Sequence, residues 1–171
     1  MDITIRCIDR DDIPIVAKLA NNPAIAQMTA NLPYPYTIDH ATTWLDYVEL
    51  HECEHVFAIV GDGNVMGVIG LVHEAEHERA ELGYWLGQAY WNQNIMTAAA
   101  GMAIAYAFSM LHVQKIYSRC FAPNIASQRV LEKNGFQLEG CLREHHIRMG
   151  VVQDVNCYGL LRSDYENGNC Q

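Results

Sequence analysis

Polar and apolar residues alternate along seven short stretches of this chain, and a period of two predicts half-buried β-strands. The stretches are residues 3–8, 56–60, 65–72, 80–86, 115–121, 136–149 and 151–161. Apolar positions at helical spacing predict helices that begin at Asp11 or Asp12, at Thr37 or Asp39, near Asn94 and at Asn124. The order is a strand, two helices, three strands, a helix, a strand, a helix and two strands. We therefore predict a single mixed α/β domain over residues 1–165.

Glycine, proline and asparagine mark the predicted connections. Residues 61–64 predict a hairpin turn, because their glycines permit the positive φ that such turns need. Gly150 joins the last two strands, and residues 22–23 and 32–36 are predicted to be loops. Residues 166–171 form a polar end rich in Gly and Asn, so we expect a flexible tail there.

Charge and cysteine usage limit the partners and the compartment. The chain has 171 residues, a formal net charge of -9 and only three lysines. Sequence-independent binding of nucleic acid or of an anionic membrane needs a positive surface, so we expect neither partner. The six cysteines form no Cys-x-x-Cys pair, and no basic segment with a long apolar run opens the chain. We therefore expect a cytoplasmic protein with free thiols.

The stretch from Ile95 to Leu111 is apolar over nearly the length of a membrane span. It consists mostly of alanine, and predicted strands flank it on both sides. We predict a helix that is buried against a sheet.

Residues 124–136 contain the local signals of a complete short helix. Asn124 is a predicted N-cap, Val130 and Leu131 give an apolar face, and Gly135 permits the left-handed end. A predicted strand at 115–121 runs into this helix. A helix N-terminus that follows a strand offers unpaired N–H groups to an anion or a polarised carbonyl.

Four separated motifs in this chain resemble those of the GCN5-related N-acetyltransferases, in particular their RimJ/RimL-type branch. They are Asn-x-x-Ser…Leu-Glu-Lys-x-Gly-Phe within 124–136, Glu-Leu-Gly-Tyr-Trp-Leu-Gly at 81–87, the segment 89–98, and residues 140–144 with 154–161. The resemblance implies a GNAT-like domain: a twisted, mostly antiparallel sheet with helices on both faces and a parallel central pair, at 80–87 and 115–121, that splays apart. It also implies transfer of an acetyl group from acetyl-CoA to a primary amine by direct attack, without a metal.

The same resemblance implies a cofactor site. The pantetheine arm of acetyl-CoA would pair with the backbone near Trp85, Leu86 and Gly87, as an added strand does. Its pyrophosphate would lie on the N-terminus of the long helix, at Asn92, Gln93, Asn94, Ile95, Met96 and Thr97. Asn124 would reach the pantetheine and Lys133 a phosphate, with Arg129 an equal candidate by charge.

This phosphate loop departs from the family pattern. Trp91, Asn94 and Met96 stand where the family has Arg or Gln, Gly, and Gly or Ala. Asn tolerates a left-handed backbone better than most residues, so Asn94 can replace glycine. The Met96 side chain must point away from the phosphates.

Glu81 and Ser127 are the catalytic candidates. Glu81 lies beside the proposed cleft and is the candidate base for the amine proton. Many relatives place a tyrosine acid where this chain has Leu131, which cannot donate a proton. Ser127, one turn earlier, is the nearest hydroxyl for the departing thiolate.

Each of these residues also has an ordinary structural interpretation. Asn124 and Ser127 can serve only the first turn of their helix, and Lys133 can be a solvated charge. Glu81 can be a surface carboxylate paired with Arg79 or with solvent.

Two other functions remain open at this point. The strings His51–His55 and His73–His77 both read His-Glu-x-x-His, the zinc-hydrolase pattern, but neither falls within a predicted helix. A non-catalytic acyl-CoA sensor is favoured by Met96 and Leu131. Protein N-terminus, polyamine, aminoglycoside and free amino acid remain possible acceptors, and the protein is expected to be a monomer or a homodimer.

Overall fold

A seven-stranded sheet organises the chain in the computed structural model, which describes residues 2–168. The strand order is β1-β2-β3-β4-β5-β7-β6. The strands are β1 (Ile3–Cys7), β2 (Glu54–Gly61), β3 (Asn64–Glu74), β4 (Arg79–Leu86), β5 (Lys115–Phe121), β6 (Gln137–Arg148) and β7 (Val151–Leu161). Every neighbouring pair is antiparallel except β4 and β5, which are parallel. The predicted mixed α/β fold with one parallel pair is confirmed.

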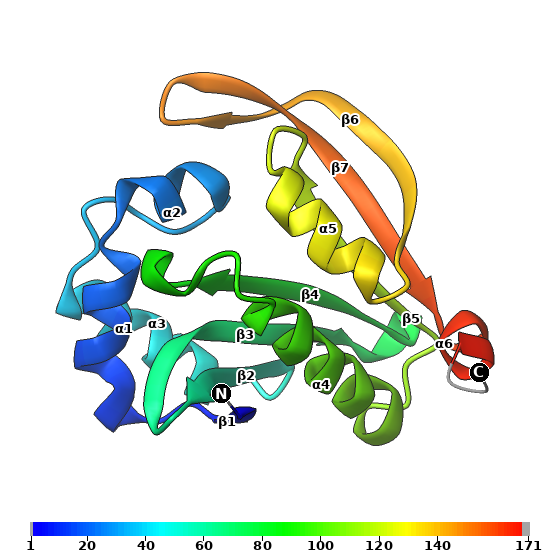
Figure 1. Cartoon of the computed structure of the whole chain (residues 1–171), viewed down its shortest axis with the longest axis horizontal. Helices are drawn as coiled ribbons and strands as arrows, with labels where there is room; N and C mark the ends of the chain where they lie inside the picture. The colour runs from blue at the N-terminus through cyan, green and yellow to red at the C-terminus, as the bar shows by residue number, and fades with distance from the viewer. Residues whose placement is uncertain (1, 169–171) are drawn as a thin grey trace.

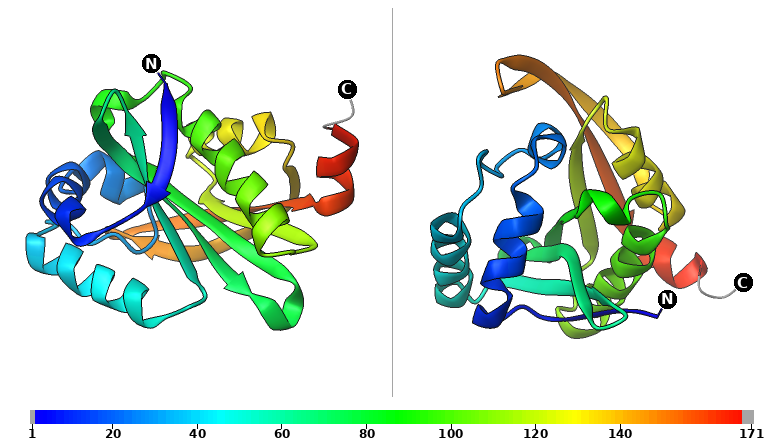
Figure 2. Two further views of the ribbon diagram at one scale, coloured as in Figure 1. Left: turned by 90° about the horizontal axis from the view of Figure 1, so that it is seen from below. Right: turned by 60° about the vertical axis from the view of Figure 1, so that its left-hand side comes forward.

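Helices cover both faces of this sheet (Figures 1 and 2). Helices α4 (Ile95–Met110) and α5 (Ile125–Lys133) lie on one face, where the larger core packs around Ile69, Leu82 and Ile104. Helices α1 (Ile13–Ala20) and α3 (Ile38–Leu50) lie on the other, over a smaller core. Each face of the sheet therefore has its own hydrophobic core.

Helix α4 is the apolar stretch that resembled a membrane span. Four alanines on it (Ala99, Ala100, Ala103 and Ala107) are fully buried, and their small side chains let the helix approach the sheet closely. Within residues 2–168, none of the helices combines the length and hydropathy needed to cross a membrane. The prediction of a buried helix is confirmed.

Two short helices correct the sequence-based assignment. Residues 22–23 were predicted to be loop, but they open helix α2 (Pro23–Met28), with Asn22 capping Ala24 N–H at 2.8 Å. The predicted flexible tail begins inside helix α6 (Arg162–Gly168), where Tyr165 stacks on Phe108 at 4.7 Å between ring centroids. Contacts with a distant helix hold α6, and the sequence gives no local sign of them. The rest of the predicted tail, residues 169–171, lies outside the described residues.

The β6–β7 hairpin projects from the far edge of the sheet and arches over α5 (Figure 1). Its strands shift register between Leu142 and His146, where Glu144 has a φ of 50° and donates its N–H to Asp154 Oδ1 at 2.7 Å. This bulge bends the hairpin, so that its tip lies toward α2.

Candidate active site

The parallel seam between β4 and β5 is open over most of its length. Only three register pairs join the strands, from Arg79 with Lys115 to Glu81 with Tyr117. Beyond Glu81, β4 stays paired with β3, while β5 follows β7. The predicted splayed pair is therefore present, with its vertex at Glu81 and Tyr117.

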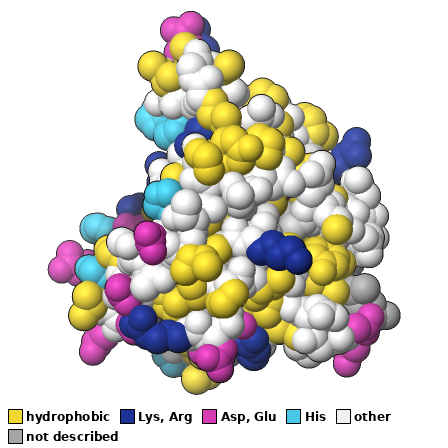
Figure 3. Space-filling model, turned by 90° about the vertical axis from the view of Figure 1, so that its left-hand side faces the viewer, with side chains coloured by type: hydrophobic (Ala, Val, Ile, Leu, Met, Phe, Trp, Pro, Cys, Tyr) yellow, Lys and Arg dark blue, Asp and Glu magenta, His cyan; other side chains and the backbone are white. Residues whose placement is uncertain are grey.

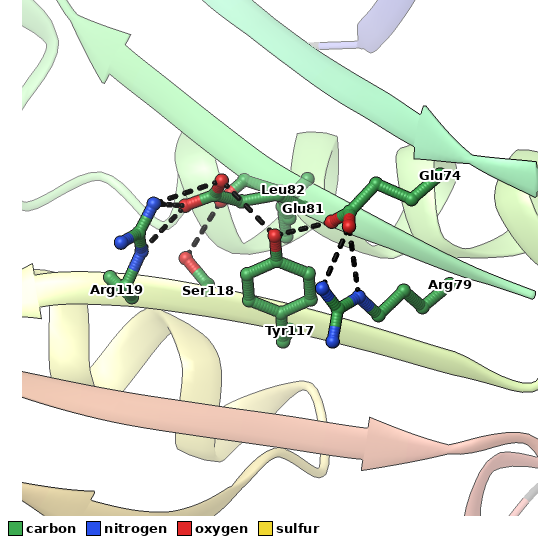
Figure 4. A network of polar contacts seen from close by, with 7 residues as sticks. All are labelled: Glu74, Arg79, Glu81, Leu82, Tyr117, Ser118 and Arg119. Atoms are coloured by element: carbon green, nitrogen blue, oxygen red, sulfur yellow. Dashed lines mark hydrogen bonds and ion pairs between the residues drawn. The ribbon is translucent and has the colours of Figure 1, made fainter. Parts of the chain in front are cut away.

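A buried side chain completes the seam at its vertex. Ser118, only 3% exposed, donates its hydroxyl to Leu82 O at 2.8 Å, just beyond the last register pair (Figure 4). The carbonyl of Leu82 is thus satisfied by a side chain instead of a strand.

The free edge of β4 presents defined backbone groups. In an extended strand, the N–H and C=O of alternate residues point to the same edge. Leu82 O faces β5, while Gly87 N–H bonds to Met66 O of β3 at 2.8 Å. Tyr84 and Leu86 therefore turn their backbone groups to the opening, and Trp91 Nε1 already donates to Leu86 O at 2.7 Å.

Among the predicted pantetheine contacts, only Leu86 points its backbone to the opening. Trp85 and Gly87 face β3 with their backbone, and the Trp85 ring packs on the smaller core under α1 and α3.

The loop before α4 has the backbone shape expected of a phosphate site. Asn92 and Asn94 both lie in the left-handed region, at φ of 60° and 58°. The expectation that Asn94 can stand in for glycine in backbone shape is confirmed. Asn94 does not cap the helix with its side chain, and the first intrahelical bond starts at Ala98 N–H. The N–H groups of residues 95–97 thus have no partner further back in the helix.

Two predicted residues of this loop turn inward. Ile95 is 3% exposed and Met96 7% exposed, and both belong to the larger core. Met96 therefore points away from the helix end, as a phosphate there would require. Gln93 lies on the exposed side, where its side chain bonds to Ala89 O at 3.0 Å.

Helix α5 is bound to this same loop. Lys133 Nζ donates to Asn94 Oδ1 at 2.9 Å, and Asn134 Nδ2 donates to Thr97 O at 3.2 Å. The structure thus brings Lys133, one of the two candidate cations, to the N-terminus of α4. Arg129, the alternative by charge, is exposed.

Two hydroxyls, one from α5 and one from β4, meet at the first turn of α5. Asn124 Oδ1 accepts from Ser127 N–H at 3.1 Å, which confirms the predicted cap. The Ser127 hydroxyl lies 2.9 Å from the Tyr84 hydroxyl, which comes from β4 across the open seam. Burial raises the pKa of Tyr84 well above its usual value, so the phenol stays protonated and available to donate.

Tyr84 was not singled out from the sequence. Its alternation with Leu82 and Leu86 on β4 was the available signal, because all three share the face covered by α4 and α5. Leu131, which stands where many relatives have a tyrosine, is fully buried in that core.

A buried thiol lies on the same face of β5. Burial raises the pKa of Cys120 to about 11, against an opposing hydrogen bond from Ser127. The thiol therefore stays neutral at physiological pH.

Glu81 lies on the opposite face of the sheet, within a polar network (Figure 4). Arg119 donates to both of its oxygens, Nε to Oε1 at 2.9 Å and Nη2 to Oε2 at 3.1 Å. The Tyr117 hydroxyl approaches Oε2 at 3.3 Å. The sequence suggested Arg79 as the partner of Glu81, but Arg79 pairs with Glu74.

The rest of this network extends away from the opening. Tyr117 donates to Glu74 Oε1 at 2.5 Å, and burial together with the two carboxylates raises the pKa of Tyr117. Hydrogen bonds from Arg79 and Tyr117 lower the pKa of Glu74. Glu81 is the one carboxylate of the network at the vertex.

Neither His-Glu-x-x-His string forms a metal site. His51 ends α3 and stacks on Tyr47, whereas His55 lies on β2 and contacts the Tyr106 hydroxyl at 3.3 Å. The second string spans the end of β3 and a 3-10 turn. Residues 2–168 contain no group of three or more His, Cys, Asp or Glu side chains arranged to hold a metal.

The profile of the acetyltransferase (GNAT) domain family matches residues 2–137. The uncharacterised N-acetyltransferase YoaA of Bacillus subtilis is 34% identical over 99 residues, which cover 57% of this chain and 56% of that protein. The ribosomal-protein-serine acetyltransferase of Escherichia coli is 28% identical over 153 residues, 86% of each chain.

A solved structure has nearly the same fold. Spermidine N-acetyltransferase from Vibrio cholerae, in complex with CoA and spermine, superposes with a TM-score of 0.86 at 25% identity. The superposition covers 96% of this chain and 98% of that one.

Proposed function

This chain belongs to the acetyltransferase (GNAT) domain family, in which acetyl-CoA is the co-substrate and an amine the acceptor, and we propose that its acceptor is the amino terminus of a protein chain. The observation that carries the site assignment is the open seam beyond Glu81, next to the uncapped start of α4. An extended thioester tail fits such an opening, because its amides can pair with the free edge of a strand.

The two sides of the sheet divide the substrates. The N-terminus of α4, Lys133 and the first turn of α5 lie on one face, so the phosphates and thiol of acetyl-CoA belong there. We assign the phosphate contacts to residues 92–97 and Lys133, and the pantetheine contacts to Asn124 and to the backbone groups of Tyr84 and Leu86. The amine must then approach the thioester from the other face.

That other face presents three residues at the vertex, namely Glu81, Gly83 and Arg119. Glu81 accepts a proton from the attacking nitrogen, and the bidentate contact with Arg119 fixes the orientation of its carboxylate. Gly83 is exposed, and a Cβ added there would meet nothing within 4 Å, so space for the amine remains beside the base.

The reaction then balances as follows. The ammonium group loses one proton to water, and the neutral nitrogen attacks the thioester carbon while Glu81 takes the second proton. A backbone N–H of Tyr84 or Leu86 stabilises the oxyanion. The carbon–sulfur bond breaks, and the thiolate accepts a hydrogen bond from the Ser127 hydroxyl. The thiolate then takes a proton from water, and Glu81 returns its proton to water, so that each turnover releases one proton.

The charges around the acceptor face favour an amine with a single positive charge. Residues 13–38, which include α2, contain one charged side chain, Lys18. Glu81 and Glu74 are matched by Arg119 and Arg79. A polyamine carries several ammonium groups and needs several unmatched carboxylates, whereas a protein N-terminus presents one amine followed by an uncharged backbone.

The surface near α2 and the hairpin tip is also partly apolar. Met28, Tyr34, Ile147 and Met149 are 40%, 46%, 71% and 51% exposed. On the face in Figure 3, acidic side chains gather mainly toward the lower edge and the lower left, while hydrophobic ones extend up to the hairpin. Such a surface fits a peptide chain better than a polycation.

A substrate panel tests the proposal. It contains peptides with free N-termini, their N-acetylated counterparts as blanks, spermidine, an aminoglycoside and free amino acids, with thiol release as the readout. We expect kcat/KM for the best free peptide to exceed that for spermidine by about tenfold or more. Preferential turnover of spermidine would contradict the acceptor class, and CoA binding without any turnover would indicate a binding module.

Variants at the two catalytic candidates test the assigned roles. Glu81→Gln should lower kcat about 100-fold and Ser127→Ala about tenfold, because each removes one group that acts on the transition state. Both should still bind CoA in calorimetry. Glu139→Gln is the matched control, since it breaks an exposed ion pair with Lys115 at the closed end of the seam. Unchanged kcat in both variants would remove these roles while the transferase activity stands.

A further inference from the structure

The segment around α2 lies between the hairpin tip and the open ends of β4 and β5 (Figures 1 and 2). Polar contacts connect this segment to three other parts of the fold. Asn22 Nδ2 donates to Gln88 Oε1 at 2.7 Å beyond β4, and Asn124 Nδ2 reaches Met28 O at 3.5 Å from α5. The third contact comes from the hairpin.

Arg148, at the end of β6, supplies that contact. Its Nε donates to Ala26 O at 2.6 Å, and its Nη2 donates to Leu32 O. One guanidinium fork thus bonds to a carbonyl in the last turn of α2 and to a carbonyl of the following loop. A cation is also favoured at that helix end, where the last carbonyls have no intrahelical partner.

The loop after α2 has few other polar contacts. From Ala30 to Tyr34, no backbone N–H donates to another part of the chain within residues 2–168. The next contact along the chain is from Tyr36 N–H to Asn21 Oδ1 at 3.1 Å. Tyr36 is 6% exposed in the smaller core, whereas Tyr34 is 46% exposed on the loop. Leu32 packs against the smaller core, and Arg148 supplies the polar contacts that hold the exposed part of the loop.

We propose that Arg148 is a positioning residue that holds residues 29–36 against the β6–β7 hairpin and thereby shapes the acceptor entrance. This inference rests on the proposed function, because it requires the amine to enter on the Glu81 face. Within residues 2–168, the hydrogen bonds of Arg148 reach neither the vertex nor the start of α4. Its loss should therefore affect the acceptor and leave acetyl-CoA alone.

The test combines kinetics with amide exchange on the full chain. For Arg148→Ala, we expect the acceptor KM to rise about tenfold, because two charge-assisted hydrogen bonds are lost. The acetyl-CoA KM should stay within about twofold and kcat within about threefold, since the catalytic groups are untouched. Amide exchange of residues 29–36 should accelerate at least about tenfold.

Two further variants separate positioning from general destabilisation. Arg148→Lys keeps the charge but loses the fork, so its acceptor KM should fall between the wild-type and alanine values. Arg10→Ala removes an arginine that also has two partners, Asp46 and Glu49, and should change neither the acceptor KM nor the exchange of residues 29–36. A wild-type acceptor KM in Arg148→Lys would overturn the two-carbonyl geometry.

The outcomes distinguish this inference from the proposed function. If wild-type protein acetylates no amine of the panel, the proposed function fails, and the exchange data still decide whether Arg148 holds the loop. If exchange accelerates in Arg148→Ala but the acceptor KM is unchanged, the entrance role is wrong while the transferase activity stands. If the acetyl-CoA KM rises as much as the acceptor KM, Arg148 acts on the whole fold.

Discussion

The two edges of strand β4 differ more in the length of their strand pairing than the two edges of any other strand that has neighbours on both sides. Its edge toward β3 is paired at eight register positions, from Gly67 with Leu86 to Glu74 with Arg79. Its edge toward β5 is paired at three and then left open. One strand thus serves as a structural strand on one edge and as a binding edge on the other.

What replaces the missing pairing is a set of side chains. Ser118 satisfies Leu82 O at the vertex, and Tyr84 meets Ser127 further along. A side-chain hydroxyl can move aside for a ligand, whereas a strand pairing cannot be broken without exposing several backbone groups at once. The comparison indicates that this opening is built into the sheet and held in shape by hydroxyls.

The largest expected difference between the two edges is in the stability that is lost when a glycine beside each edge is replaced by alanine. A Cβ at Gly67, on the paired edge, would lie 2.4 Å from Trp85 O and 2.9 Å from Leu86 Cα. Gly67→Ala should therefore cost about 3 kcal/mol, a drop of roughly 6–12 °C in Tm by thermal denaturation.

Gly83→Ala is the matched variant on β4 beside the vertex, where an added Cβ meets nothing within 4 Å. Its stability should stay within about 0.5 kcal/mol of wild type. Acetyl transfer should fall, because the methyl group occupies the space proposed for the amine. Equal destabilisation by both substitutions would show that the open edge is as tightly packed as the paired one.

The features of this fold that depend on residues close together in the chain were predictable from the sequence. The Asn124 cap and the hairpin at residues 61–64 each follow from side chains a few positions apart, and the left-handed Asn94 follows from the family pattern of the loop; each is confirmed. Helix α2 was missed although Asn22 and Pro23 are good start signals, because six residues are too few to show helical periodicity.

The partners across the seam were not predictable. Glu81 with Arg119, and Tyr84 with Ser127, come from segments about forty positions apart, as their separations of 38 and 43 show. The register between two strands and the placement of α5 determine these contacts, and neither leaves a mark on the local sequence. Arg148 and Ala26, 122 positions apart, are the extreme case.

A smaller effect is expected at the vertex. Ser118→Ala leaves Leu82 O buried without its donor, which should cost about 1.5 kcal/mol, or roughly 3–6 °C in Tm. Ser109→Ala is the control, because its exposed hydroxyl bonds to Ala105 O at 2.6 Å and water can replace it there. A Tm for Ser118→Ala that matches the control would mean that this hydroxyl does not hold the vertex.

The smallest effect, and the most specific to catalysis, is expected at Tyr84. Tyr84→Phe keeps the ring in the core but removes the hydroxyl that meets Ser127, so kcat should fall about threefold with the acetyl-CoA KM unchanged. Tyr158→Phe is the control, since its hydroxyl also reaches α5, at Gln128 and Glu132, without touching Ser127.

If Tyr84 acts by orienting Ser127, the Tyr84→Phe/Ser127→Ala double variant should be no slower than Ser127→Ala alone, because the two losses share one interaction. Fully additive losses would instead assign Tyr84 an independent contact with the substrate. In that case the hydroxyl pair across the open seam would be two separate sites rather than one support for the departing thiolate.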